Sequence, residues 1–127
     1  MRHISYIIIC VVMVLSSVAC GRQHSAKQAV EEFMESNLKE PSTLTALHFE
    51  HFDSTRHITD SVVAVLRHTV SAAAKQYKAD VKYADSKPTQ STVFIHATYQ
   101  CGGKQYADTY YLDQELTGVV AFMSRED

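Results

Sequence analysis

The apolar residues of this chain form one dense run at the N-terminus, followed by segments with two different periods. The run covers residues 4–15, comes after the positive charge of Arg2, and is followed by small residues at 16, 17 and 19. This order is typical of a secretory signal peptide. A membrane-spanning helix needs about 20 apolar residues, and the polar segment 21–25 ends the run too early. We therefore expect residues 1–19 to be a cleaved signal peptide, with an uncleaved N-terminal anchor as the alternative.

Two later segments repeat apolar residues at steps of three and four, which is the period of one helical face. The first predicts a helix over residues 26–39. Ser25 and Gln28 form a capping box at its start. Pro41 ends it, because the residue before a proline avoids helical geometry.

The second of these segments predicts a helix over residues 61–78, with Thr59 or Asp60 as its N-cap. Between the two helices, residues 43–53 predict a strand whose alternation is imperfect. The polar residues 82–90 predict a loop, with a short strand at 80–84.

Alternation at residues 92–101 and 104–113 predicts two strands joined by the turn Gly102-Gly103, because both glycines can adopt positive φ. This turn fixes the register, so that the numbers of cross-strand partners add up to 205. One face of the hairpin is mixed in character. It pairs His96 with Thr109 and is expected to be half exposed. A last strand is predicted at 118–123. The more apolar face carries Val93, Ile95, Ala97, Tyr99, Tyr106, Asp108, Tyr110 and Leu112.

The order of elements is helix, strand, helix and three antiparallel strands (α-β-α-β-β-β). It predicts an α+β fold with two helices packed on one face of a small, mainly antiparallel sheet. A cystatin-like roll fits this order by analogy, as does a nuclear-transport-factor-like roll. The chain is long enough for one core but not for two, so residues 25–127 are predicted to form a single domain.

The segment Ser16-Ser17-Val18-Ala19-Cys20 resembles the lipobox of bacterial prolipoproteins, in which a small residue directly precedes the cysteine. The departure from that pattern is Ser17, where leucine is usual. The resemblance implies that Cys20 receives a diacylglycerol group and becomes the first residue of the mature protein, with 20–24 as a lipidated tether. Two or three acyl chains anchor a protein stably to a membrane, whereas one gives marginal binding.

The residues after Cys20 bear on the destination of such a lipoprotein. Gly21 is not the aspartate that signals inner-membrane retention in enteric bacteria. Residues 21–25 also lack the acidic residues that mark surface export in Bacteroides-type lipoproteins. The resemblance therefore implies an outer-membrane lipid anchor facing the periplasm.

Residues 26–123 resemble the small lipoproteins of Bacteroides and its relatives. The segments that carry this second resemblance are Val30-Glu31-Glu32-Phe33-Met34, the segment from Asn37 to Leu44, and Asp108-Thr109-Tyr110-Tyr111-Leu112-Asp113. Their motifs are not very specific, and the resemblance implies no particular activity.

Charge and cysteine content narrow the function classes. A formal net charge of −2 gives no basic footprint, so we expect no nucleic-acid partner. Cys10 leaves with the signal peptide and Cys20 is taken by lipid, so Cys101 has no partner for a structural disulfide. A free cysteine packs like a small hydrophobic residue, so Cys101 is expected to be buried.

The histidines and acids do not predict a catalytic or metal site. His48 and His51 are three residues apart, and on a strand an odd separation places two side chains on opposite faces. His96 and Cys101 are expected on opposite faces for the same reason, which leaves the thiol without a general base. Asp108 has a raised pKa if it is buried, or is solvated near the hairpin end. We expect no metal and no other cofactor.

Four hairpin tyrosines are the candidate binding residues, because tyrosine is favoured at interfaces: Tyr99, Tyr106, Tyr110 and Tyr111. The other interpretation is ordinary core and cross-strand packing. Since no catalytic set converges, we expect a non-enzymatic binding or accessory module, held at the membrane by lipid on Cys20, with an envelope protein or a small ligand as partner. The alternative is a small envelope hydrolase with a site assembled from loops.

Overall fold

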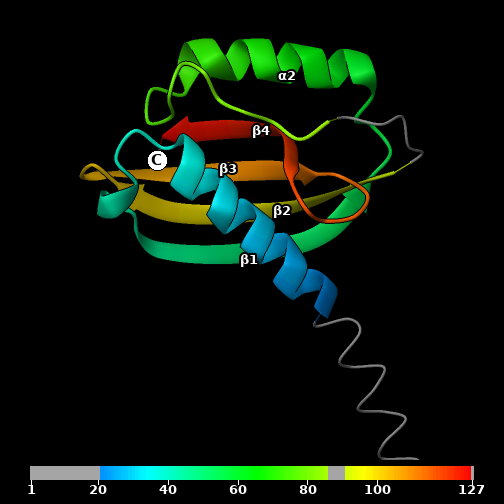
Figure 1. Ribbon diagram of the computed structural model, residues 1–127, viewed down its shortest axis with the longest axis horizontal. Coiled ribbons are helices and arrows are strands. Elements are labelled where there is room, and N and C mark those ends of the chain that lie inside the picture. Colours follow the sequence, from blue (N-terminus) through cyan, green and yellow to red (C-terminus); the bar gives the residue numbers. More distant parts are fainter. Residues whose placement is uncertain (1–20, 86–90, 127) are drawn as a thin grey trace, which may run out of the picture.

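A computed structural model describes residues 21–85 and 91–126 and shows an α+β fold (Figure 1). Four antiparallel strands form one sheet in the order β1-β2-β3-β4, so that each strand pairs with its neighbour in sequence. Two α-helices accompany the sheet, which confirms the predicted fold class. The elements are a helix at residues 21–37, η1 (Pro41–Thr43), β1 (Thr45–Thr55), α2 (Asp60–Ala73), β2 (Thr92–Cys101), β3 (Lys104–Leu112) and β4 (Val119–Glu126).

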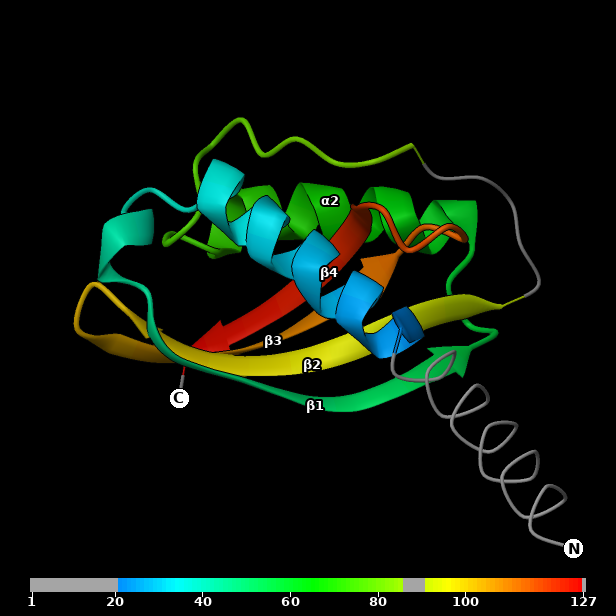
Figure 2. The same ribbon diagram turned by 60° about the horizontal axis from the view of Figure 1, so that its bottom comes forward.

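The N-terminal helix lies across one face of the sheet (Figure 2). It buries a single stripe formed by Ala26, Ala29, Val30, Phe33 and Met34. This stripe packs against the apolar face of the sheet in the main core, where Phe33 contacts the rings of Tyr110 and Phe122. The stripe has the predicted period, because residues three and four apart share one side of a helix.

The ends of this helix differ from the prediction. Residues 21–25 are already helical, so Ser25 lies inside the helix and is not its N-cap. A capping box is one way to satisfy the first free N–H groups, and a helix that starts earlier does not need it at Ser25. The helix ends after residue 37, where the Asn37 side chain donates to the Phe33 carbonyl at 2.8 Å and Leu38 forms an isolated bridge with Tyr77.

The β2–β3 hairpin has the predicted register throughout its paired length. Cys101 pairs with Lys104, Ile95 with Tyr110, and Ala97 with Asp108. Gly102 and Gly103 have φ values of +59° and +81°, which side chains with a Cβ rarely adopt. The glycine pair therefore determines both the turn and the two faces of the hairpin.

Strand β1 contains two irregularities that explain its imperfect alternation. Its register to β2 shifts between Thr45 and His48 and again between Glu50 and Asp53. Ala46 and His51 have positive φ values of 55° and 52° at these two places. A bulge adds a residue to one strand and turns the following side chains to the other face, so a simple period of two fails here.

Helix α2 lies beside β4 at the edge of the sheet (Figure 1). Thr59 is its N-cap, as predicted, since its Oγ1 accepts from the Val62 amide at 3.3 Å. Arg67 attaches the helix to the sheet, because its guanidinium donates to the Val120 carbonyl at 2.8 Å and to the Ala84 carbonyl at 2.9 Å. A second apolar cluster joins Val63 of α2 to Tyr111, Val120 and Ala121.

The segment after α2 does not match the prediction. The helix ends at Ala73 instead of residue 78, and residues 81–85 form no strand. Ala84 instead donates its amide to the Val119 carbonyl at 2.9 Å, so this segment lies along β4. Residues 86–90 of the predicted loop are outside the described residues. Strand β4 extends three residues beyond the predicted end, to Glu126.

Candidate functional site

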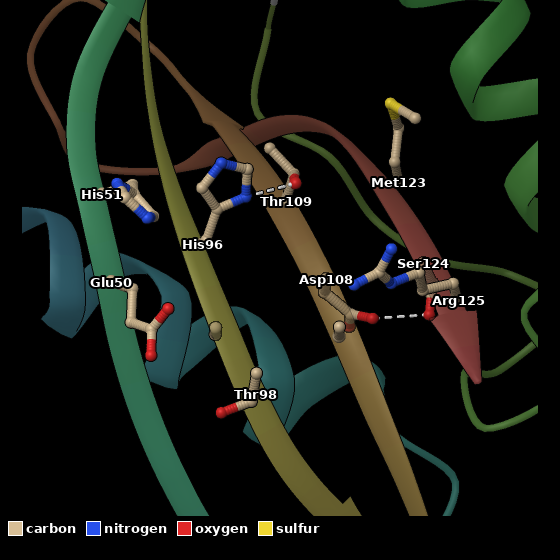
Figure 3. Close-up of a pocket in the computed structure, with 11 residues that line it drawn as sticks. Glu50, His51, His96, Thr98, Asp108, Thr109, Met123, Ser124 and Arg125 are labelled. Carbon is tan, nitrogen blue, oxygen red and sulfur yellow. Dashed lines mark hydrogen bonds between the residues drawn. The ribbon is translucent and has the colours of Figure 1, made fainter. Parts of the chain in front are cut away.

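A pocket of about 400 Å³ lies on the sheet face that the N-terminal helix leaves uncovered (Figure 3). In this view the blue N-terminal helix lies behind the sheet, and His51, His96 and Thr109 stand on the near side. Every strand contributes to the pocket. The side chains that give it its chemical character are Glu50, His51, His96, Thr109, Met123 and Arg125.

His96 is the central titratable group of this pocket. Its Nδ1 lies 2.6 Å from the Thr109 hydroxyl, its cross-strand partner. Partial burial lowers the pKa of His96, the neighbouring His51 and Arg125 side chains lower it further, and Glu50 opposes them. His96 is therefore neutral at neutral pH and can either donate to or accept from a ligand, depending on its tautomer.

His51 reaches this pocket because of the β1 bulge. Its ring centroid is 5.6 Å from that of His96, in an edge-to-face arrangement. His48 contacts Glu50 at 3.3 Å and pairs with Thr98, which lies on the same open face as His96. The prediction that His48 and His51 point to opposite faces is therefore wrong, since the bulge at His51 breaks the alternation.

Asp108 lies on the covered face and is surrounded by hydroxyl groups. It is 2% exposed. Its Oδ2 accepts from Tyr77 at 2.9 Å, from Tyr99 at 2.6 Å and from Tyr110 at 2.7 Å, while its Oδ1 accepts from Ser124 at 2.5 Å. Of the two predicted outcomes for Asp108, burial is the one that occurs.

The pKa values of this cluster follow from burial. Burial raises the pKa of Asp108 above that of an ordinary carboxyl, and hydrogen bonds from Ser124 and the three tyrosines offset part of that rise. Burial and the neighbouring Asp108 raise the pKa of Tyr99, and burial with neighbouring tyrosines and Asp108 raises those of Tyr77 and Tyr110. The tyrosines therefore stay protonated and act as donors, so the cluster holds the domain together and presents no exposed reactive group.

Two members of the cluster were not foreseen, because they belong to the segment predicted to be helical. Tyr77 follows the end of α2 and turns inward to Asp108. Gln76 donates to Ser124 at 2.7 Å and to Tyr99 at 3.2 Å. No local sequence signal marks this turn, since the apolar period continues through Ala74 and Tyr77.

The four candidate tyrosines are buried. Tyr99 and Tyr110 belong to the Asp108 cluster, Tyr106 packs against Tyr99, and Tyr111 belongs to the cluster under α2. They occupy core positions, so none of them offers a free binding surface. The pocket residues on β1 and β4 were missed, because sequence alone did not place these strands beside the mixed face of the hairpin.

Cys101 is buried, as predicted, and is 5% exposed. Its sulfur lies 3.3 Å from the Thr43 hydroxyl and donates to the Glu40 carbonyl at 3.6 Å. The register places His96 on the other face, so the described geometry provides no general base for this thiol. Cys20, the predicted lipidation site, lies outside the described residues.

Within residues 21–85 and 91–126, no group of three or more His, Cys, Asp or Glu side chains is arranged to hold a metal ion. None of the described helices has the length and apolar character needed to cross a membrane. Comparison with protein-family models, curated proteins and solved structures found no match for this chain. The cystatin-like roll therefore stays an analogy.

Proposed function

We propose that this chain is the precursor of an outer-membrane lipoprotein facing the periplasm, and that its domain is a non-enzymatic binding or accessory module. The sequence Ser16-Ser17-Val18-Ala19-Cys20, placed after an apolar run, supports the lipid anchor. Lipid on Cys20 would then hold the binding module at the membrane surface.

The observation that carries the binding function is the pocket on the open face of the sheet. The opposite face is filled by the N-terminal helix and the Asp108 cluster. The open face presents imidazole, hydroxyl, carboxylate and guanidinium groups beside Met123, which is 50% exposed. Ligand sites commonly combine a few polar groups with an adjoining apolar surface, and this pocket has both.

Site-specific photo-crosslinking in the producing cells tests this function. A benzophenone amino acid at Met123 lies in the pocket, and the matched control position is Gln114, which is exposed in the β3–β4 loop. We expect a defined adduct at Met123, none at Gln114, and loss of the adduct when Thr98→Trp fills the pocket. Equal adducts at both positions, or an adduct that Thr98→Trp leaves unchanged, would contradict binding at this pocket.

A second candidate function, a small hydrolase, has one specific observation in its favour. The 2.6 Å contact between Thr109 Oγ1 and His96 Nδ1 is the distance at which a neutral imidazole can accept a hydroxyl proton. This pair lies on paired strands instead of the loops that we expected for a hydrolase. Acyl transfer also needs donors that stabilise an oxyanion. The backbone amides of β2 and β3 are already used in pairing the strands of the sheet, so they do not supply such donors. We therefore rank the hydrolase below the binding module.

The hydrolase candidate is tested with activated esters, comparing the wild type with Thr109→Val. Thr109→Val keeps the shape of the side chain but removes the hydroxyl. We expect the same slow background rate in both proteins. A steady turnover that disappears in Thr109→Val, with an unchanged unfolding midpoint, would reverse the ranking.

A further inference from the structure

We propose that the domain lies against the membrane on its β1 side, with Arg22 and Lys27 on anionic lipid headgroups. This proposal rests on the lipidation of Cys20 proposed above. It goes beyond the anchor itself, because it states which surface of the domain touches the bilayer and which charges hold it there.

The first observation is the absence of a flexible tether within the described residues. Residue 21 is already helical, and residues 21–25 are exposed. Ala26 is the first buried residue of the chain that the structure describes, at 0% exposure. From Gly21 to Ala26 the helix advances about 7.5 Å. One more peptide unit adds at most about 4 Å, so the domain surface begins within about 12 Å of the anchoring cysteine. A coil of the same length would let the domain rotate relative to the membrane, whereas a helix that is packed into the core restricts this rotation.

The second observation is the direction of the helix across the sheet. In Figure 1 its first turns extend past β1, and the helix runs from there toward β4. The Lys27 ammonium lies 6.0 Å from the centre of the Phe49 ring on β1. At the other end, Leu38 pairs with Tyr77 beyond α2. The lipid therefore approaches the domain from the β1 edge, and α2 lies on the far side.

The third observation is the order of charges along the helix. Residues 21–30 carry Arg22 and Lys27, with His24 between them, and no acid, while the acids Glu31, Glu32 and Glu35 come later. The helix dipole favours the reverse order, with acids near the N-terminus and bases near the C-terminus. An anionic surface next to the first two turns would complement the observed order. Each Lys or Arg near such a surface strengthens the contact about fivefold.

Strand β1 suits a position against a headgroup layer. It is an outer strand of the sheet and contains no fully buried residue. Apart from the small Ala46, its exposed side chains are polar or charged, with His48, Glu50, His51 and Asp53 along its length. Edge strands are commonly covered or made irregular to prevent pairing with another chain, and a membrane surface on this side would add cover to an edge that already contains two bulges.

The test uses the mature lipidated protein in vesicles of phosphatidylglycerol and phosphatidylethanolamine that carry a headgroup acceptor dye. A donor dye is placed at Asp53→Cys on β1 or at Val65→Cys on α2, each in a Cys101→Ser background. Both positions are exposed, and Val65 is 63% exposed. We expect stronger energy transfer from position 53 than from position 65. Equal transfer, or stronger transfer from position 65, overturns the proposal.

Two double substitutions of equal charge separate a specific contact from general electrostatics. Arg22→Gln/Lys27→Gln removes two positive charges at the start of the helix. Lys39→Gln/Lys75→Gln removes two from exposed positions beyond its far end, where the Lys39 amide donates to the Gln76 carbonyl at 3.0 Å. We expect the first pair to reduce the difference in transfer and its sensitivity to salt, and the second pair to leave both unchanged. Equal effects of the two pairs overturn the headgroup contact.

The intact mass of each protein shows whether Cys20 carries lipid. A failure of the proposed orientation can therefore be told apart from a failure of the proposed lipid anchor. If the protein begins at Cys20 and carries acyl chains, but the labels show no preferred side, the orientation is wrong and the proposed lipoprotein function stands. If Cys20 carries no acyl chain, the proposed function itself has failed, and the orientation fails with it.

Discussion

Tyr77 and Tyr83 form a matched pair that tests the role of the Asp108 cluster. Both lie in the segment after α2, and both rings pack against Phe33 and Phe122. The Tyr77 hydroxyl donates to Asp108 at 2.9 Å. The Tyr83 hydroxyl is buried and has no hydrogen-bond partner among the described residues. Replacing each with phenylalanine removes one oxygen from a similar ring environment.

The expected losses of stability differ because the hydroxyls differ. A hydrogen bond to a charged group contributes about 1.5–3 kcal/mol, so Tyr77→Phe should lower the free energy of unfolding by about that amount at pH values where Asp108 is ionised. Removing a buried hydroxyl without a partner relieves an unmet desolvation cost. Tyr83→Phe should therefore leave stability unchanged or raise it slightly.

Urea unfolding followed by circular dichroism measures both variants, because a change in the midpoint at constant slope reports stability alone. The deficit of Tyr77→Phe should shrink in acid, where Asp108 is protonated and accepts a weaker hydrogen bond. Equal losses in the two variants would refute the claim that the Asp108 contacts, and not ring packing, stabilise this segment.

Four further predictions follow from single sites. Gly118→Ala should lower stability by about 1–3 kcal/mol, measured by thermal unfolding, because the new Cβ would lie 2.7 Å from the Ala84 Cβ; unchanged unfolding would contradict that close approach. The raised pKa of Asp108 favours its protonated form in the folded state, so the stability it contributes is present at acid pH and lost as pH rises through its folded pKa. Asp108→Asn should abolish this loss, measured by urea unfolding at a series of pH values. A free energy of unfolding that changes with pH as steeply in the variant as in the wild type would count against it. Cys101 should react with alkylating reagents only as fast as the protein unfolds, and Cys101→Ser should fold normally; rapid alkylation of the native protein would show that the thiol is accessible. Ile95→Ala should cost about 2–5 kcal/mol in the same unfolding assay, since Ile95 is 1% exposed; a loss near zero would place the core elsewhere.

Local sequence signals predicted the hairpin and the helical stripe correctly. The glycine pair at 102–103 determines a register, and a register determines the neighbours of every side chain on both strands. The placement of Asp108 beside Tyr99 and Tyr110, and of His96 opposite Thr109, therefore follows from the position of these two glycines. In the same way, the stripe from Ala26 to Met34 follows from helical period alone.

The parts that sequence could not predict depend on tertiary contacts or on backbone irregularity. The end of α2 at Ala73 has no local marker, and Tyr77 leaves the helical period because its hydroxyl reaches a buried carboxylate. The β1 bulge at His51 requires a positive φ that nothing in its neighbours signals. This bulge brings His51 to His96, so the pocket could not be assembled from the alternation of polar and apolar residues.

The most direct test of the proposed lipoprotein is the intact mass of the protein purified from membranes of cells that process it, together with its Cys20→Ser variant. We expect the wild type to lack residues 1–19, to begin at Cys20, and to carry the added mass of a diacylglyceryl group and its acyl chains. The Cys20→Ser variant should carry no lipid and keep its signal peptide. A wild-type protein that retains residues 1–19, or is cleaved elsewhere without lipid, would contradict the account.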